Sequence, residues 1–309
     1  MAETEHDAPA RAVIVMTGAT SGIGAVAAQR ILRTHPARFL VGARSASSAS
    51  SAAAWEPIKL DLASLASVRV FASDVLARLG PSQIDALVLN AGVGTNPSGA
   101  RTEDGFEETF AVNHLAHYLL LRLLTPRLAP GARVVITTSN THDPRTSPVA
   151  PRHADADRLA HPETDPEYDG PSSREGFRAY SSSKLGNVLM ARALAASALA
   201  RDRGISVIAY NPGFTLGTGL GRNLPLALRL LARVVGSLAA PLRRFNTVDQ
   251  GGEILADLVV GQIVPPAGRM YASVVHRELT WPDPSELALR DDVMSKLWDD
   301  SARLVDLPD

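Results

Sequence analysis

Two residues of this chain are spaced for proton chemistry: Tyr180 and Lys184, in the stretch Tyr-Ser-Ser-Ser-Lys. Residues four apart in a helix share one face, so both side chains would reach a single site. A phenol has an ordinary pKa of about 10 and is a poor base at neutral pH. A neighbouring ammonium stabilises the phenolate and lowers that pKa, which lets Tyr180 act as an acid or a base. Lysine is scarce, with three among 31 basic residues, so the pairing is informative.

A glycine-rich stretch at 17–24, Thr-Gly-Ala-Thr-Ser-Gly-Ile-Gly, directly follows an apolar run. Glycines allow a tight turn, a close approach of backbone N–H groups to a pyrophosphate, and close packing of a helix on a strand. A plain connecting turn is the alternative, but the position after a first strand favours a dinucleotide site. The predicted cofactor-binding residues of this turn are Gly18, Thr20, Ser21, Gly22, Ile23 and Gly24.

The adenine end of such a site depends on the second strand. A ribose with a 2′-phosphate favours a guanidinium there, and an unphosphorylated ribose favours a carboxylate. Arg44 follows this strand and no acidic residue occurs before Glu56, so the sequence favours NADP over NAD, unless Arg44 is an ordinary solvated arginine. Asp61, followed by Leu62, ends the next apolar stretch. Its carboxylate would accept from an adenine amino group or cap the following helix.

The elements that must position these residues alternate along the chain, as in a parallel sheet covered by helices. Most predicted strands lack period-two alternation, which is typical of strands buried on both faces. Strands are expected at 12–17, 39–43, 86–90, 133–138, 206–210 and 268–272. Helices are expected at 22–34, 65–79, 104–128, 177–203 and 247–260, the last opening with a Thr-x-x-Gln capping box. The sequence therefore predicts an α/β fold with a single doubly wound, Rossmann-type parallel sheet.

Further polar residues lie at the carboxyl ends of these strands, where open α/β sheets bind ligands. Ser139 follows the 133–138 strand, and its hydroxyl can donate to a substrate oxygen as charge develops on it, with Thr138 as an imperfect rival. Asn113 lies in the 104–128 helix, where a buried amide needs a reason, although a core or capping asparagine is the alternative. Predicted cofactor contacts from the other strand ends are Asn90, Ala91 and Gly92, and, beneath the nicotinamide carboxamide, Pro212, Gly213 and Thr215.

Length and composition restrict the remaining functions. The 309 residues suffice for one large α/β domain, expected at 11–309 after a disordered tail at 1–10. A net charge of −1 gives no electrostatic case for nucleic acid. The absence of cysteine excludes disulfides and thiolate chemistry, and no metal site is predicted. No apolar run reaches the roughly 18 residues of a membrane span and the tail is no signal peptide, so a cytoplasmic protein is expected.

Two stretches break the alternation of strands and helices. Residues 142–174 are polar and rich in Pro and Asp, and residues 215–245 are apolar with scattered Arg. Both flank the predicted chemistry, so each either covers a substrate or is a surface insertion. The apolar second stretch suggests a fairly hydrophobic small-molecule substrate. Within it, 224–242 would serve as a lid, a dimer contact or a membrane-surface helix.

Together these motifs resemble the short-chain dehydrogenases/reductases over about residues 11–268. The matching features are Thr-Gly-x-x-x-Gly-Ile-Gly, Asn-Ala-Gly at 90–92, Pro-Gly at 212–213, and Asn113, Ser139, Tyr180 and Lys184. The resemblance implies that these four residues form a catalytic tetrad. Tyr180 would exchange the proton, Ser139 polarise the carbonyl, Lys184 hold the ribose and lower the Tyr pKa, and Asn113 anchor a proton-relay water. The family commonly pairs subunits through the helices that carry Asn113 and Tyr180, so a homo-oligomer is an open expectation.

The stretches Thr-Glu-Asp-Gly-Phe-Glu at 102–107, Val-Asn-His-Leu at 112–115 and Ser-Lys-Leu-Gly-Asn at 183–187 are similar to the retinol-dehydrogenase and WW-domain-oxidoreductase branch. So is Arg44, which in that branch goes with NADP. Two departures are Ser21, where some NADP-using relatives carry a basic residue, and Asn211, where the branch has His. The chain is thus predicted to be an NADP(H)-dependent alcohol dehydrogenase or carbonyl reductase. The alternatives are the same enzyme class with NAD(H), or a non-catalytic dinucleotide-binding sensor or scaffold.

Overall fold

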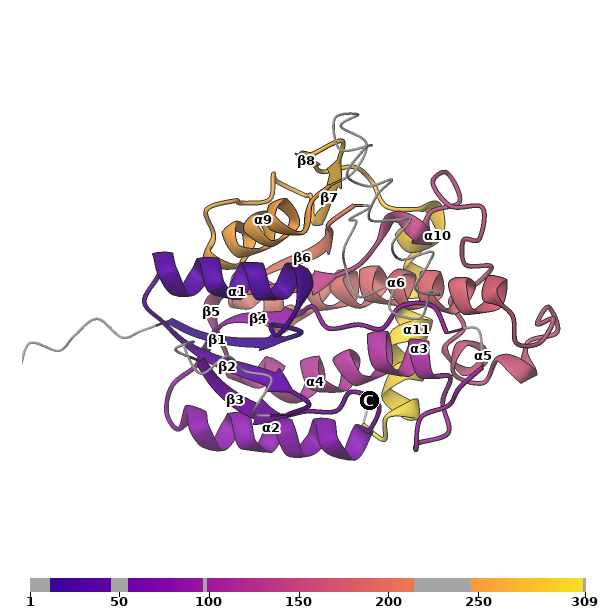
Figure 1. Cartoon of the computed structure of the whole chain (residues 1–309), viewed down its shortest axis with the longest axis horizontal. Coiled ribbons are helices and arrows are strands. Elements are labelled where there is room, and N and C mark those ends of the chain that lie inside the picture. Colours follow the sequence, from indigo (N-terminus) through magenta and orange to yellow (C-terminus); the bar gives the residue numbers. More distant parts are fainter. Residues whose placement is uncertain (1–11, 46–54, 97–98, 214–245, 308–309) are drawn as a thin grey trace, which may run out of the picture.

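A computed structural model describes residues 12–45, 55–96, 99–213 and 246–307. Its centre is one eight-stranded sheet in the order β3-β2-β1-β4-β5-β6-β7-β8 (Figure 1). All neighbouring strands are parallel except β7 and β8. The strands are β1 Ala12–Thr17, β2 Ala37–Ala43, β3 Trp55–Lys59, β4 Ile84–Leu89, β5 Leu128–Thr137, β6 Ser206–Asn211, β7 Tyr271–Val275 and β8 Glu278–Thr280. The predicted doubly wound Rossmann-type fold is confirmed, and its strand order reverses between β1 and β4.

Helices cover both faces of this sheet, as Figure 1 shows. On one face α1 Gly22–Thr34 packs beside α9 Val248–Val260. The other face carries α2 Leu65–Leu79, α4 Ala116–Leu124 and α6 Ser173–Ala196. Two separate cores result, one on each side, and β1 contributes alternate residues to them: Val13 and Val15 to one, Ile14 and Met16 to the other. This two-sided burial explains why the strands carry no polar face.

Several predicted boundaries were wrong for identifiable reasons. Strand β3 was missed because Trp-Glu-Pro-Ile-Lys buries only Ile58, so it lacks an apolar pattern. Strand β8 is three residues long and follows a tight turn with positive φ at His276 and Arg277. The last predicted strand begins at Tyr271 instead, because Gly268 adopts a φ of 72° in the turn before it.

The predicted 104–128 helix is broken into shorter pieces. Residue 107 caps α3 Glu108–Phe110, a π-helical turn follows at Ala111–Leu115, and α4 then continues. The predicted 177–203 helix begins earlier, as α6, and restarts as α7 Ala198–Asp202. Helices α10 Glu286–Leu289 and α11 Asp291–Leu304 were not predicted, and α11 packs on α6.

The predicted capping box at α9 forms only in part. The Thr247 hydroxyl accepts from the Gln250 N–H at 3.1 Å, as expected. The Gln250 side chain instead donates to the carbonyl of Arg277, so it ties α9 to the β7–β8 turn.

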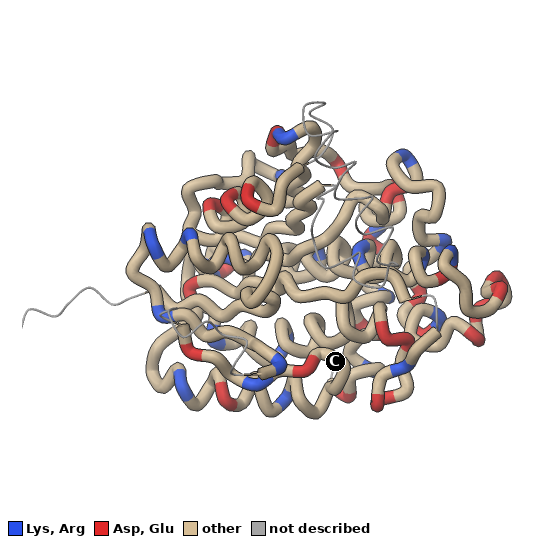
Figure 2. Tube along the Cα trace, viewed as in Figure 1, with Lys and Arg blue, Asp and Glu red and all other residues tan. Residues whose placement is uncertain are grey.

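The charge distribution matches the near-neutral net charge. In Figure 2, basic and acidic residues are interspersed along the trace. None of the helices in the described ranges is long and apolar enough to cross a membrane.

Candidate active site

The glycine-rich turn between β1 and α1 is built by close backbone contacts. Gly18 has a φ of 70°, and a Cβ there would lie 2.7 Å from the backbone of Ala91. A Cβ on Gly24 would overlap the carbonyl oxygen of Gly18. Both positions therefore require glycine, so that α1 can start close against the ends of β1 and β4.

The start of α1 suits a pyrophosphate. Ser21 is its N-cap residue but makes no side-chain capping hydrogen bond, and the first turn holds no acidic residue. A Cβ added to Gly22 would meet nothing within 4 Å, so the space beside this turn is open. The first N–H groups of α1 thus keep their donors for an anion, which is the fit that a dinucleotide needs.

The residues that follow β4 are fixed from β1 and β5. Thr17 Oγ1 accepts from the N–H groups of Asn90 and Ala91 at 3.0 and 3.1 Å. The Asn90 amide donates to Gly18 O at 3.1 Å and accepts from Thr137 Oγ1 at 3.0 Å. The predicted cofactor contacts at 90–92 therefore lie directly against the glycine-rich turn.

The adenine end of the site is exposed. Arg44 and Asp61 are both exposed and follow neighbouring strands, because β2 and β3 pair up to Ala43 and Lys59. Asp61 does not cap the next helix, since Ser64 fills that role by accepting from the Ser67 N–H. Its carboxylate accepts from the Ala63 N–H at 3.0 Å. Leu62 is half-buried and packs against the core.

The other end of the cofactor site follows β6. Asn211 is buried, donates to Ser273 Oγ at 2.9 Å and accepts from the Gly213 N–H at 3.0 Å. The Asn246 amide donates to Pro212 O at 2.9 Å and fixes the turn from the other side. Thr215 and the 215–245 segment lie outside the described residues.

The structure brings the four predicted catalytic residues to the same edge of the sheet. The Ser139 side chain neighbours the Tyr180 hydroxyl closely enough to lower its pKa. Lys184 Nζ lies 5.5 Å from the centroid of the Tyr180 ring and 3.4 Å from Thr137 O. Thr138 is a poor rival for Ser139, because its buried hydroxyl donates to Lys184 O at 2.7 Å.

Asn113 is fully buried in the π-helical turn and joins three segments. Its amide oxygen accepts from the Val93 N–H at 2.8 Å, and its amide nitrogen donates to Val93 O and to Ser183 Oγ, each at 3.1 Å. The side chain therefore fixes the loop after β4 against α6. π-helical turns are frequent at functional sites because they release a backbone carbonyl from the helix pattern.

Burial controls the titration of the Tyr–Lys pair. It raises the pKa of Tyr180 to about 12, and the neighbouring Ser139 side chain opposes this rise. It lowers the pKa of Lys184 to about 8. The expectation that Lys184 brings the Tyr180 pKa below its usual value is therefore wrong for this arrangement, since burial raises that pKa.

The polar 142–174 insertion is more ordered than its composition indicates. It forms α5 Ala156–Ala160 and a 3-10 turn at Pro162–Thr164, and its last two residues begin α6. With the first turns of α6 it encloses a pocket whose lining includes Phe110, Leu159, Tyr168 and Ala179. None of the four predicted catalytic residues lines this pocket, so the described insertion lies beside the tetrad.

Sequence reasoning missed three polar residues that border the tetrad. His117 contacts Asn113 O and Thr17, His142 contacts Ser139 O, and Asn187 donates to Thr137 O at 3.0 Å. All three side chains are buried. The sequence did hold a signal for the two histidines. His117 follows Asn113 by four residues, about one helical turn, and His142 follows Ser139 by three.

These features define a dinucleotide-binding α/β protein of the Rossmann type with a Tyr–Lys pair at the carboxyl edge of its sheet. A family model described as short chain dehydrogenase matches residues 12–148. The WW domain-containing oxidoreductase of Danio rerio is 34% identical over 305 residues, which cover 95% of this chain and 68% of that protein. Retinol dehydrogenase 14 of Homo sapiens is 30% identical over 325 residues, which cover 95% of this chain and 86% of that protein.

A solved structure of an uncharacterized protein from Mycobacterium paratuberculosis has a TM-score of 0.69 at 28% identity, over 96% of this chain and 94% of that one. The chain therefore belongs to the short-chain dehydrogenase/reductase family of oxidoreductases, in its retinol-dehydrogenase-like branch. This family uses a nicotinamide dinucleotide.

Proposed function

We propose that this protein is an NADP(H)-dependent carbonyl reductase or alcohol dehydrogenase that acts on a ketone, aldehyde or secondary alcohol. One observation carries the proposal: buried Tyr180 has the Ser139 side chain near its hydroxyl and Lys184 Nζ 5.5 Å from the centroid of its ring. This group lies at the same sheet edge as a glycine-rich turn with free helix N–H groups.

The four tetrad residues have different roles in the reduction of the substrate's carbonyl group. Bound NADPH would supply the hydride to the carbonyl carbon. Tyr180 donates a proton from its phenolic oxygen to the carbonyl oxygen, and the Ser139 hydroxyl donates a hydrogen bond to the same oxygen. Burial raises the Tyr180 pKa to about 12, so the phenol is protonated at neutral pH and can donate its proton during reduction. Lys184 holds the cofactor ribose, and Asn113 keeps the loop after β4 in place.

The preference for NADP(H) rests on Arg44. Its exposed side chain follows β2, where a guanidinium can bind a 2′-phosphate through charge-assisted hydrogen bonds. Asp61 then faces the adenine side of the same edge. The N–H groups at the start of α1 bind the pyrophosphate.

A fairly hydrophobic substrate is the second part of the proposal. The composition of residues 215–245 supports it, and so does a relative named for retinol, a hydrophobic alcohol. A panel that pairs small polar ketones with long-chain and cyclic apolar ketones tests this part. Turnover of the small polar ketones alone would overturn it.

The decisive experiment is a fluorescence titration with NADPH and NADH in parallel, followed by a ketone screen with the cofactor that binds more tightly. Tight NADPH binding together with turnover supports the proposal. If NADH binds more tightly than NADPH, the proposed role of Arg44 is wrong but the proposed enzyme class still stands. Cofactor binding without turnover on any substrate, unchanged in Tyr180→Phe, would favour the sensor or scaffold alternative.

A further inference from the structure

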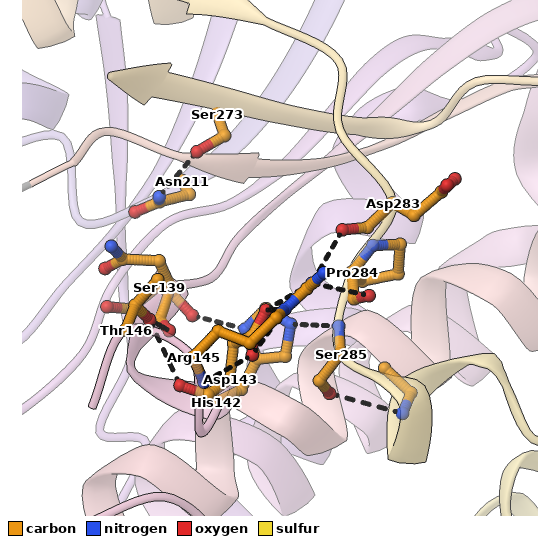
Figure 3. Close-up of polar contacts among 12 residues, drawn as sticks. Ser139, His142, Asp143, Arg145, Thr146, Asn211, Ser273, Asp283, Pro284 and Ser285 are labelled. Carbon is orange, nitrogen blue, oxygen red and sulfur yellow. Dashed lines mark hydrogen bonds and ion pairs between the residues drawn. The ribbon is translucent and has the colours of Figure 1, made fainter. Parts of the chain in front are cut away.

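His142 bridges Ser139 to a distant segment of the chain. It ends the 3-10 turn Asn140–His142 after β5 and is 2% exposed. Its Nδ1 lies 2.6 Å from Ser139 O, and its Nε2 lies 3.3 Å from the Ser285 N–H. Figure 3 shows the imidazole between these two partners.

The partners of His142 determine its tautomer. The Ser285 N–H can only donate, so Nε2 must be the unprotonated nitrogen. The carbonyl of Ser139 can only accept, so Nδ1 carries the hydrogen and donates it. Burial lowers the pKa of His142, which agrees with a neutral imidazole.

Other contacts hold this imidazole between the same two segments. Its ring packs edge-on against Tyr271, with centroids 5.4 Å apart and planes at 88°. The Arg145 guanidinium, paired with Asp143, donates to Asp283 O at 3.3 Å and Pro284 O at 3.2 Å (Figure 3). The turn after Ser139 is therefore fastened to the segment that leads into α10.

His117 makes the corresponding bridge on the other side of the tetrad. It is fully buried in α4, with Nδ1 3.1 Å from Asn113 O and Nε2 3.0 Å from Thr17 Oγ1. Thr17 Oγ1 already accepts from the N–H groups of Asn90 and Ala91, so its own hydrogen is donated to Nε2. Nδ1 of His117 is thus the protonated nitrogen, and it donates to the carbonyl of Asn113.

We propose that His117 and His142 are positioning residues, each an Nδ1–H tautomer that donates to the backbone carbonyl of a tetrad residue and fixes that residue's orientation. The proposal deepens the function proposed above and rests on the roles of Asn113 and Ser139. Each imidazole uses a donor and an acceptor at once, so it links its tetrad residue to a second segment: β1 for Asn113, and 283–285 for Ser139. A misplacement of about 1 Å at a reacting group can lower a rate by about 100-fold.

The first arm of the test needs no substrate and no cofactor. A long-range proton–nitrogen NMR spectrum of the wild-type protein with ¹⁵N-labelled histidine, at neutral pH, reports which ring nitrogen is protonated. Assignment comes from the spectra of His117→Gln and His142→Gln, each of which loses one imidazole. Both residues are expected as neutral Nδ1–H tautomers. An Nε2–H tautomer or a charged imidazolium at either position overturns the proposal for that residue.

The second arm separates positioning from stability. His142→Phe keeps the ring against Tyr271 but removes both hydrogen bonds, whereas His142→Gln keeps a donor and an acceptor. The Phe variant is expected to lose about 10- to 100-fold in kcat, with KM and the NADPH dissociation constant within about twofold, and the Gln variant to recover part of the loss. His117→Phe and His117→Gln should behave in the same way.

His114→Phe is the matched control. His114 is equally buried, but its ring nitrogens contact the Asn187 and Ser301 side chains and no tetrad carbonyl. It is expected to lower the melting temperature while kcat stays within about twofold. Equal losses of kcat in His117→Phe, His142→Phe and His114→Phe would mean that His117 and His142 have a purely structural role. A wild-type protein without turnover would remove the proposed function and the positioning role together, whereas an active wild type with unaffected His117 and His142 variants removes the positioning role alone.

Discussion

Lys184 Nζ lies 5.5 Å from the centroid of the Tyr180 ring, one helical turn further along α6. Both groups are buried, and burial opposes the charged form of each: it raises the Tyr180 pKa to about 12 and lowers the Lys184 pKa to about 8. Desolvation is therefore the main cause of both pKa shifts. At neutral pH such a site keeps the Tyr180 phenol protonated. It also keeps the Lys184 ammonium buried, which destabilises the folded protein.

Removing that cation should stabilise the protein at neutral pH. The Lys184 pKa falls from its ordinary 10.5 to about 8 in the folded chain, so between these values the unfolded state binds more protons. The destabilisation is fully present below about pH 8 and disappears as the pH rises toward 10.5. Lys184→Met should raise the unfolding free energy at pH 7 by up to about 3 kcal/mol and abolish turnover. Thermal unfolding between pH 7 and 10.5 measures this, with exposed Lys59→Met as the control. An equal gain in both variants would contradict the prediction.

Tyr180→Phe should remove turnover and leave cofactor binding intact. The substitution deletes the proton donor but keeps the ring that packs at the sheet edge. A loss of about 10²- to 10⁴-fold in kcat is expected, because that is the usual contribution of a positioned general acid. NADPH affinity by fluorescence and the melting temperature should change little. Retained turnover would assign the proton donation to another group.

Arg44→Ala should weaken NADPH binding and leave NADH binding unchanged. A hydrogen bond to a charged phosphate contributes about 1.5–3 kcal/mol, which corresponds to about 10- to 100-fold in affinity. Parallel titrations of both cofactors measure the change. Arg33→Ala, an exposed arginine near the end of α1, is the control. Equal affinity of Arg44→Ala and the wild type for NADPH would mean that Arg44 is an ordinary solvated side chain.

Acid should destabilise the protein through its buried histidines. Burial lowers the pKa of His114 and of His117 to about 4, from an ordinary 6.5. Between these values the unfolded chain takes up protons that the folded chain does not, so stability falls as the pH is lowered from about 6.5 to about 4. His114→Phe should reduce the slope of unfolding free energy against pH by about one proton, whereas exposed His276→Asn should leave it unchanged. An unchanged slope in His114→Phe would show that His114 becomes protonated without unfolding.

The sequence predicted the parts of the site that depend on local patterns. Tyr180 and Lys184 are one helical turn apart, and the glycine-rich turn between β1 and α1 is a short-range motif, so spacing alone placed them. The bridges of His117 and His142 were not predictable, because their partners Thr17 and Ser285 are 100 and 143 residues away. The Tyr180 pKa was predicted in the wrong direction for a related reason: spacing reveals a neighbouring charge but not the depth of burial.

The C-terminal helix α11 leads to the last prediction, that the protein is a monomer. It packs on α6, which carries Tyr180, and on α4, which follows the turn that carries Asn113. Trp298 meets the Tyr118 ring edge-on at 4.9 Å and lies 5.3 Å from the Arg122 guanidinium, while buried Leu297 faces the core.

A second subunit cannot occupy this surface while α11 covers it, so light scattering should give a monomer at micromolar concentration. Leu297→Ala removes apolar packing from the covered side of α11 and should cost about 2–5 kcal/mol. The exposed face gives the matched control, Asp299→Ala, which should stay within about 0.5 kcal/mol of the wild type. Deletion of residues 291–309 should expose the apolar face of α4 and α6 and yield dimers or larger species. A stable dimer of the full chain would contradict the prediction.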